Sequence, residues 1–147
     1  MKLLNDKVAI VTGAARGIGE AIALKFAAHG AHVAFTYVSN SSSDKADALQ
    51  KKLQALGVKA KAYQSNAGDF TQSEVLINDV LETFGAVDIC VNNAGISKDN
   101  LLLRMSSDQW EEVISTNLGS IFNMTKQVIR PMMKAKSGSI INMSSII

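Results

Sequence analysis

The sequence repeats one unit three times: a helix-like stretch that ends in glycine, followed by a run rich in apolar and β-branched residues. Gly30, Gly57 and Gly85 close these stretches and lie 27 and 28 residues apart, about the length of one strand plus one helix. Glycine adopts the left-handed conformation that ends helices at little cost. Alternating strands and helices with short connections predict a parallel sheet covered on both faces, that is, a doubly wound α/β fold.

Polar residues ahead of three of the predicted helices mark where these helices begin, because their side chains accept hydrogen bonds from the first free helix amides. The candidate caps are Ser41, Ser42 or Ser43, then Asp69 with Gln72 or Thr71 with Glu74, and finally Ser106 with Gln109. The predicted strands span 7–11, 32–37, 58–64, 87–91 and 139–143, and the predicted helices span 17–29, 43–56, 70–84 and 107–135.

Length and composition limit the classes of function that such a fold can serve. The 147 residues, 47% of them hydrophobic, suffice for one domain with a sizeable core, and we see no boundary or linker. Fifteen basic and 13 acidic residues are too balanced for nucleic-acid binding through bulk charge. No apolar stretch approaches the roughly 20 residues that span a bilayer, and the first residues lack the apolar core of a secretory signal. We expect a cytoplasmic protein that binds neither nucleic acid nor membrane.

A glycine-rich turn, TGAARGIG at residues 12–19, joins the first predicted strand to the first predicted helix. A helix that begins at Gly17 exposes unpaired amides and a positive dipole end, which together bind anions. Gly13 permits the sharp turn, Gly17 lets the backbone approach a pyrophosphate, and Gly19 lets the helix lie close to the strand. In this strand-turn-helix context the three glycines predict a dinucleotide site.

Arg16, within the same turn, indicates which dinucleotide is bound. Proteins that prefer NAD usually carry an acidic residue at the end of the second strand, whereas none occurs here until Asp44. A guanidinium together with donors at Ser39, Asn40 and Ser41 suits a 2′-phosphate better. We therefore expect NADP(H) as the cofactor; the alternative is that Arg16 is a solvated loop charge.

Three further polar signals lie along the later part of the chain. The run Asn92 to Gly95 follows an apolar strand containing Cys90, whose thiol we expect to be buried and inert. Open α/β sheets bind ligands at this carboxyl edge, although a simple turn would use the same residue types. Asn117 stands in mid-helix between apolar residues, where a polar amide needs a partner. Ser144 and Ser145 follow the last predicted strand at the same edge.

These signals, in this order, resemble the short-chain dehydrogenase/reductase family, whose pattern is T-G-x-x-x-G-x-G, N-N-A-G, a helical Asn and a Ser after the fifth strand. The segments NNAGISKDNLLLRM, DKVAIVTGAARGIG and RPMMKAKSGSIINMSSII are very similar to one group within it, the 3-oxoacyl-[acyl-carrier-protein] reductases of bacterial fatty-acid synthesis. The resemblance implies a cytoplasmic homotetramer that reduces 3-oxoacyl to 3-hydroxyacyl thioesters with NADPH. Another short-chain reductase, acting on acetoacetyl-CoA, a sugar or another ketone, is the alternative.

The resemblance also implies roles for single residues. Ser145, beside Ser144, would orient the keto oxygen, and the Asn117 backbone carbonyl would hold a water of a proton relay. An acidic acyl carrier protein would dock near Arg130 and Lys136, where a solvated helix end is the alternative reading. No metal site is expected. The residues implied to bind the cofactor fall into three groups. Asn66 and Ala67 would contact the adenine, and Asn93, Ala94 and Gly95 would lie at the ribose. The phosphate groups would be bound by Gly13, Ala14, Ala15, Arg16, Gly17, Ile18, Gly19 and Ser39.

The family pattern continues with a tyrosine about a dozen residues after the serine and a lysine four residues later, which supply and tune a proton. The only tyrosines here, Tyr37 and Tyr63, are followed at that spacing by Ser41 and Ala67 and do not match. We therefore expect these residues to be the N-terminal part of an enzyme, able to bind part of the cofactor without turnover. A gene product of this length would instead be a non-catalytic NADP-binding module.

Overall fold

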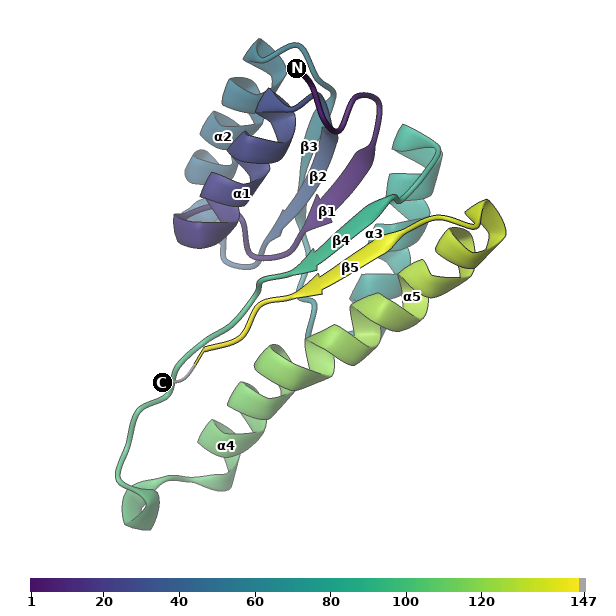
Figure 1. The fold of residues 1–147 in the computed structure, drawn as a ribbon. Helices are drawn as coiled ribbons and strands as arrows, with labels where there is room; N and C mark the ends of the chain where they lie inside the picture. The colour runs from purple at the N-terminus through teal and green to yellow at the C-terminus, as the bar shows by residue number, and fades with distance from the viewer. Residues whose placement is uncertain (146–147) are drawn as a thin grey trace.

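Five parallel strands form one twisted sheet in the computed structural model, which describes residues 1–145 (Figure 1). The sheet has the order β3-β2-β1-β4-β5, and every neighbouring pair is parallel. The predicted doubly wound α/β fold is thus confirmed. The direction of winding changes between β1 and β4, which is where such sheets open a ligand crevice at their carboxyl edge. The strands are β1 (Val8–Val11), β2 (His32–Tyr37), β3 (Ala60–Gln64), β4 (Ile89–Asn92) and β5 (Ser139–Asn142).

Helices cover both faces of the sheet, α1 and α2 on one side and α3 and α5 on the other (Figure 1). Gly30, Gly57 and Gly85 follow the first three of these helices with φ of 92°, 84° and 83°, so the predicted left-handed ends are confirmed. The helices are α1 (Gly17–Ala28), α2 (Ser43–Ala55), α3 (Phe70–Phe84), α4 (Ser107–Ile114) and α5 (Ser120–Ala135), with short 3₁₀ turns at Asn40–Ser42 and Leu102–Arg104.

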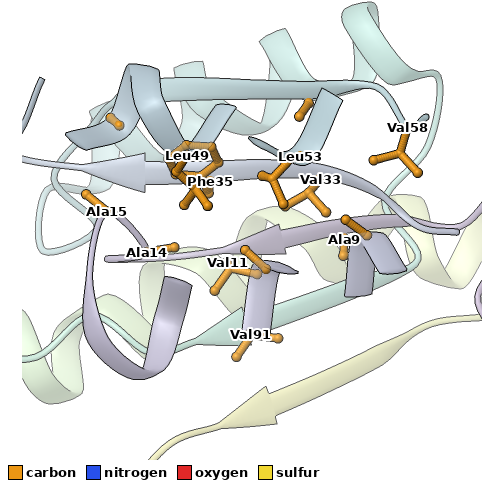
Figure 2. Packing of buried hydrophobic residues seen from close by; sticks show 14 of the residues in the cluster. Ala9, Val11, Ala14, Ala15, Val33, Phe35, Leu49, Leu53, Val58 and Val91 are labelled. Atoms are coloured by element: carbon orange, nitrogen blue, oxygen red, sulfur yellow. The ribbon is translucent and has the colours of Figure 1, made fainter. Parts of the chain in front are cut away.

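The sheet separates two apolar cores because successive side chains of a strand point to opposite faces. On one face, Leu49 and Leu53 of α2 pack over Val33 and Phe35 of β2 (Figure 2). On the other face, Cys90 of β4 belongs to the core beneath α3 and α5 and is fully buried. Burial raises the pKa of its thiol to about 12, so the prediction of a buried, inert cysteine is confirmed.

The helix predicted over 107–135 begins and ends where expected, but a π turn that was not predicted interrupts it. The α4 helix ends at Ile114, residues Ser115–Gly119 form the π turn, and α5 begins at Ser120. Four of the five residues of the sequence STNLG, namely Ser115, Thr116, Asn117 and Gly119, have a lower helix propensity than Leu or Ala. A π turn adds one residue to one helical turn, and the hydrophobic periodicity on either side does not reveal it.

Two predicted strands also begin too early, since β3 and β4 each start two residues later than expected. At the start of β3 the Lys59 amide donates to His32 Nδ1 at 3.0 Å, so a side chain replaces the ladder acceptor. At the start of β4 the Asp88 carboxylate accepts the Val8 amide at 2.8 Å. The other strand and helix ends agree with the prediction to within one residue.

The predicted helix caps have mixed outcomes. Ser106 and Gln109 form a reciprocal capping box at α4, as expected. Asp69 caps α3 by accepting the Gln72 amide at 2.9 Å, and the alternative beginning at Thr71 is wrong because the helix already starts at residue 70.

The serine cap predicted for α2 is wrong. Ser42 occupies the position before the helix, but its side chain makes no capping bond. The chain enters α2 through the 3₁₀ turn, and the Ser39 hydroxyl contacts those of Ser41 and Ser42 at 2.9 and 3.0 Å. Because these hydroxyls bond one another, they do not cap the helix amides.

Candidate functional site

The turn between β1 and α1 depends on glycine at two places for different reasons. Gly13 and Gly17 have φ of 64° and 62°, which side chains rarely adopt. A Cβ at Gly13 would lie 3.0 Å from the Ala94 Cα, so this residue lets two loops meet. A Cβ at Gly17 would meet no described atom within 4 Å. Gly17 therefore borders open space at the start of α1, where a ligand can approach the backbone.

Gly19 lies where α1 presses against both loops. A Cβ there would be 2.6 Å from Asn93 Nδ2 and 2.8 Å from both the Ala14 Cα and the Gly13 carbonyl oxygen. Two of these three neighbours are backbone atoms, which cannot rotate away. Only glycine fits, and the first amides of α1 are consequently held close to the end of β1.

Thr12 joins the glycine turn to the segment after β4. Its buried hydroxyl accepts the amides of Asn93 and Ala94, both at 3.0 Å, and lies 3.4 Å from the Val91 carbonyl. In return, Asn93 Nδ2 donates to the carbonyls of Thr12 at 3.0 Å and Gly13 at 3.2 Å. The two loops thus form one rigid unit. Sequence reasoning gave Thr12 no role, and its only signal was a hydroxyl directly before the glycine triplet.

The end of β2 is fixed to the same turn. Thr36 accepts the Gly13 amide on its hydroxyl at 3.1 Å and the Ala14 amide on its carbonyl at 3.0 Å. Arg16 is exposed, directly before α1, and forms no ion pair within residues 1–145. The exposed Ser39 hydroxyl follows β2 by two residues. This edge of the sheet therefore presents a free guanidinium and a group of serine hydroxyls, which is a donor set that suits a phosphate.

The loop after β3 contains the pair expected at the adenine. The Asn66 side-chain oxygen accepts the Gly68 amide at 2.9 Å, and the Asn66 amide donates to Gln72 Oε1 at 2.9 Å. Ala67 is buried, whereas Asn66 is only half-buried. The loop is thus held in one conformation with Asn66 partly open to a ligand.

Asn117 is at the centre of the π turn, and its side chain has the hydrogen-bond partner that we expected from the sequence. Its Oδ1 accepts the Ile96 amide at 2.8 Å, while its Nδ2 donates to the Ile96 carbonyl at 2.9 Å. Both ends of the carboxamide thus hold the segment that follows Gly95. Single π turns within helices occur frequently at functional sites because they change the pairing of the backbone carbonyls.

Ser144 and Ser145 continue from β5 beside the segment that leaves β4 (Figure 1). Asn92 Nδ2 donates to Asn142 Oδ1 at 2.8 Å, and the Met143 amide donates to the Asn92 carbonyl at 3.0 Å. These bonds align the ends of the two strands, so the serines emerge at the same sheet edge as Asn93.

Arg130 and Lys136 do not join this group. Lys136 lies three residues before β5, and Arg130 lines a pocket with the residues that lead into β4, so both are at the opposite edge of the sheet. The 16-residue α5, which is about 24 Å long, runs between the two edges.

Two other classes of site receive no support from the structure. No helix in the described part of the chain is long and apolar enough to cross a membrane. Among residues 1–145, no three His, Cys, Asp or Glu side chains are grouped as metal ligands.

Known structures share this fold over nearly the whole chain. A metagenomic short-chain oxidoreductase in complex with NADP matches 98% of this chain and 64% of its own, with a TM-score of 0.91 and 33% identity. A blue fluorescent protein from a metagenomic library, in complex with NADPH, matches 97% of this chain and 57% of its own, with a TM-score of 0.89 and 39% identity.

Curated relatives are similar in sequence over nearly the whole chain. The 3-oxoacyl-[acyl-carrier-protein] reductase FabG of Staphylococcus epidermidis is 46% identical over 142 residues, which are 97% of this chain and 57% of that protein. The 3-oxoacyl-[acyl-carrier-protein] reductase of Synechocystis is 44% identical over 146 residues, 99% of this chain and 58% of the relative. The chain thus spans less than two thirds of the length of these relatives. The family model for short chain dehydrogenases matches residues 7–147. These matches agree with the glycine turn, the hydrogen bonds between Asn93 and Thr12, and the π turn around Asn117. The chain belongs to the short-chain dehydrogenase family.

Proposed function

We propose that this protein binds NADP(H) at the carboxyl edge of its sheet and is part of an enzyme that reduces 3-oxoacyl-[acyl-carrier-protein] in cytoplasmic fatty-acid synthesis. The observation that carries the proposal is the open backbone at Gly17, held in place by Thr12 and Asn93 and flanked by the free guanidinium of Arg16. Similarity to curated reductases of this activity supports the substrate class.

The residues present fit such a cofactor along its whole adenine half. The first amides of α1 would hold the pyrophosphate, since no side chain caps them. Arg16 and Ser39 would pair with the 2′-phosphate, and the Asn66–Ala67 segment would face the adenine. Asn93 and its neighbours up to Gly95 would line the ribose near the nicotinamide.

Two residues would serve the reaction itself. When bound, NADPH supplies the hydride that reduces C3 of the 3-oxoacyl thioester, and the keto oxygen gains a proton to become the hydroxyl. Ser145 would donate a hydrogen bond to that oxygen as negative charge develops on it. The Asn117 side chain is occupied by Ile96, so its backbone carbonyl is the group left to hold a water of the proton relay.

The proposed activity is tested by following NADPH oxidation by the full-length gene product with three substrates. We expect the highest kcat/KM for an acetoacetyl group on acyl carrier protein, a lower value for acetoacetyl-CoA, and little turnover of sugars or simple ketones. A preference for acetoacetyl-CoA or a sugar would favour the other reductases of the family. NADPH binding without turnover of any ketone would indicate a non-catalytic module.

Arg16→Ala should raise the Kd for NADPH roughly 10- to 100-fold, because one charge-assisted contact to the extra phosphate is lost. The Kd for NADH should change little, since NADH lacks that phosphate. Arg16→Lys keeps the charge but not the planar fork, so we expect an intermediate loss. Titration of both cofactors measures the effect, and equal losses for NADPH and NADH would refute the role given to Arg16.

We further propose that the protein acts as a homo-oligomer, a tetramer as the resemblance implies. Large apolar side chains along one face of α4, the π turn and α5 are 39–71% exposed, and we propose that a neighbouring copy covers part of this face. The exposed residues are Ile114, Leu118, Phe122, Ile129 and Met133.

The double substitution Arg130→Glu with Lys136→Glu should lower kcat/KM for the carrier-bound substrate severalfold or more. Turnover of acetoacetyl-CoA should stay near normal, because the chemistry lies at the other edge of the sheet. The defect should shrink as ionic strength rises, since exposed charges steer encounter and are screened by salt. If kcat/KM falls for neither substrate, Arg130 and Lys136 belong to a solvated helix end and not to a docking site. Equal losses of kcat/KM for both substrates would indicate damaged folding.

A further inference from the structure

Asn123 is a buried polar side chain that neither the glycine turn nor the reaction accounts for. It lies in the first turn of α5 and is 7% exposed. Its Nδ2 donates to the Ala67 carbonyl at 2.9 Å, across 56 residues of sequence. The same carbonyl receives a longer bond, 3.3 Å, from the Ser73 hydroxyl of α3. The loop after β3 is thus fastened from both helices that cover this face of the sheet.

The neighbouring π turn touches the same loop. The Ser115 hydroxyl donates to the Gly68 carbonyl at 3.5 Å, and a Cβ at Gly68 would lie 3.2 Å from that hydroxyl. Close approach at Gly68 therefore brings the loop directly against the helix segment that contains Asn117. Asn117 itself holds the segment after β4 through Ile96. One stretch of helix, residues 115–123, accordingly braces two of the loops at the carboxyl edge.

The bond from Asn123 differs from the other bonds that shape this loop. Asn66, Gly68 and Gln72 bond among themselves and thereby tie the loop to the start of α3, the helix that follows it directly in sequence. Asn123 is anchored in α5, which packs on α3 and β4. A buried carbonyl is costly to leave with fewer donors, so this contact resists movement of Ala67 away from the helix.

We propose that Asn123 is a positioning residue for the adenine subsite: by holding the Ala67 carbonyl it keeps the Asn66–Ala67 backbone where an adenine ring can pair with it. This inference rests on the proposed function, which places adenine at that pair. Asn123 is buried beneath the loop and acts through Ala67. It sets affinity for the adenine half of the cofactor and leaves the reacting end unaffected.

The test measures binding of 2′,5′-ADP, which contains the adenine and the 2′-phosphate but no nicotinamide, by calorimetry. Asn123→Leu removes the donor at similar size, and we expect its Kd to rise roughly 5- to 20-fold, the equivalent of one buried hydrogen bond. Asn123→Asp has the same shape but no donor when ionised, so its loss at neutral pH should be at least as large. As pH falls, the buried carboxyl becomes protonated and can donate again. Its affinity relative to that of the unsubstituted protein at the same pH should therefore recover at low pH.

Thr125→Val is the matched control, because the Thr125 hydroxyl on the same helix is buried with no partner among the described residues. We expect it to bind 2′,5′-ADP as the unsubstituted protein does. In the full-length gene product, Asn123→Leu should raise the KM for NADPH while kcat at saturation stays within about threefold.

Each alternative outcome has a distinct meaning. If the unsubstituted protein does not bind 2′,5′-ADP, the proposed function fails. If it binds and Asn123→Leu binds equally well, or loses kcat as much as affinity, the positioning role is refuted. Should Asn123→Leu fail to fold, the Asn123→Asp titration decides, and an affinity that does not recover at low pH overturns the inference.

Discussion

Ser145→Ala should lower kcat of the full-length gene product by about 100- to 1000-fold, the usual cost of losing one hydrogen-bond donor to an oxygen that gains charge in the transition state. The Kd for NADPH should change little, because the proposed partner of Ser145 is the keto oxygen of the substrate and not the cofactor. Interactions made only in the transition state affect kcat and leave cofactor binding intact. Single-turnover kinetics and a parallel cofactor titration measure the two quantities.

Ser144→Ala is the natural control for this prediction. Both serines are exposed and adjacent, so a general disturbance of the segment after β5 would affect them alike. If Ser144→Ala reduces kcat and Ser145→Ala does not, the role belongs to the neighbouring residue. Little change in either variant would mean that these hydroxyls only end the strand.

Gly19→Ala should lower the free energy of unfolding by about 3 kcal/mol or more, because overpacking against backbone is at the severe end of such substitutions. The added Cβ would lie 2.8 Å from both the Ala14 Cα and the Gly13 carbonyl oxygen. Thr12 fixes that backbone to the segment after β4, so it cannot relax outward cheaply. Denaturant unfolding measures the loss, and NADPH binding should fall with it.

Two other glycines separate steric clash from backbone strain. Gly17→Ala and Gly57→Ala each introduce a side chain at positive φ with no described atom within 4 Å, so both should cost about 1 kcal/mol of stability. Only Gly17→Ala should also weaken NADPH binding, because Gly57 follows α2 far from the glycine turn. A Gly19→Ala loss no larger than that of Gly57→Ala would contradict the close packing of α1.

The sequence predicts most of this fold because its determinants are local. The glycines that end three helices, the Ser106–Gln109 capping box and the alternation of strands and helices all act within a few residues. The local sequence does not predict the π turn, since one added residue barely alters the hydrophobic pattern on either side of it. The late starts of β3 and β4 involve contacts between residues far apart in sequence, Lys59 with His32 and Asp88 with Val8, and so are not visible locally.

The candidate site also combines residues whose roles are visible in the local sequence with residues whose roles depend on distant partners. Gly13, Gly17 and Gly19 are recognisable because their spacing and their place after a strand have a direct physical meaning. Thr12 and Asn123 are not, because a hydroxyl and a carboxamide acquire their roles only from partners about 80 and 56 residues away. The position of Arg130 and Lys136 also required the structure, since sequence alone does not show that α5 carries them to the opposite edge of the sheet.

The most direct test of the central claim is a titration of this protein with NADPH and with NADH under the same conditions, followed by cofactor fluorescence or calorimetry. An NADP(H) site built on the Gly17 backbone and Arg16 predicts saturable binding of one NADPH per chain, with an affinity for NADH at least about tenfold weaker. Equal affinities would contradict the assignment of the 2′-phosphate to Arg16. Failure to bind either dinucleotide would contradict the cofactor site itself.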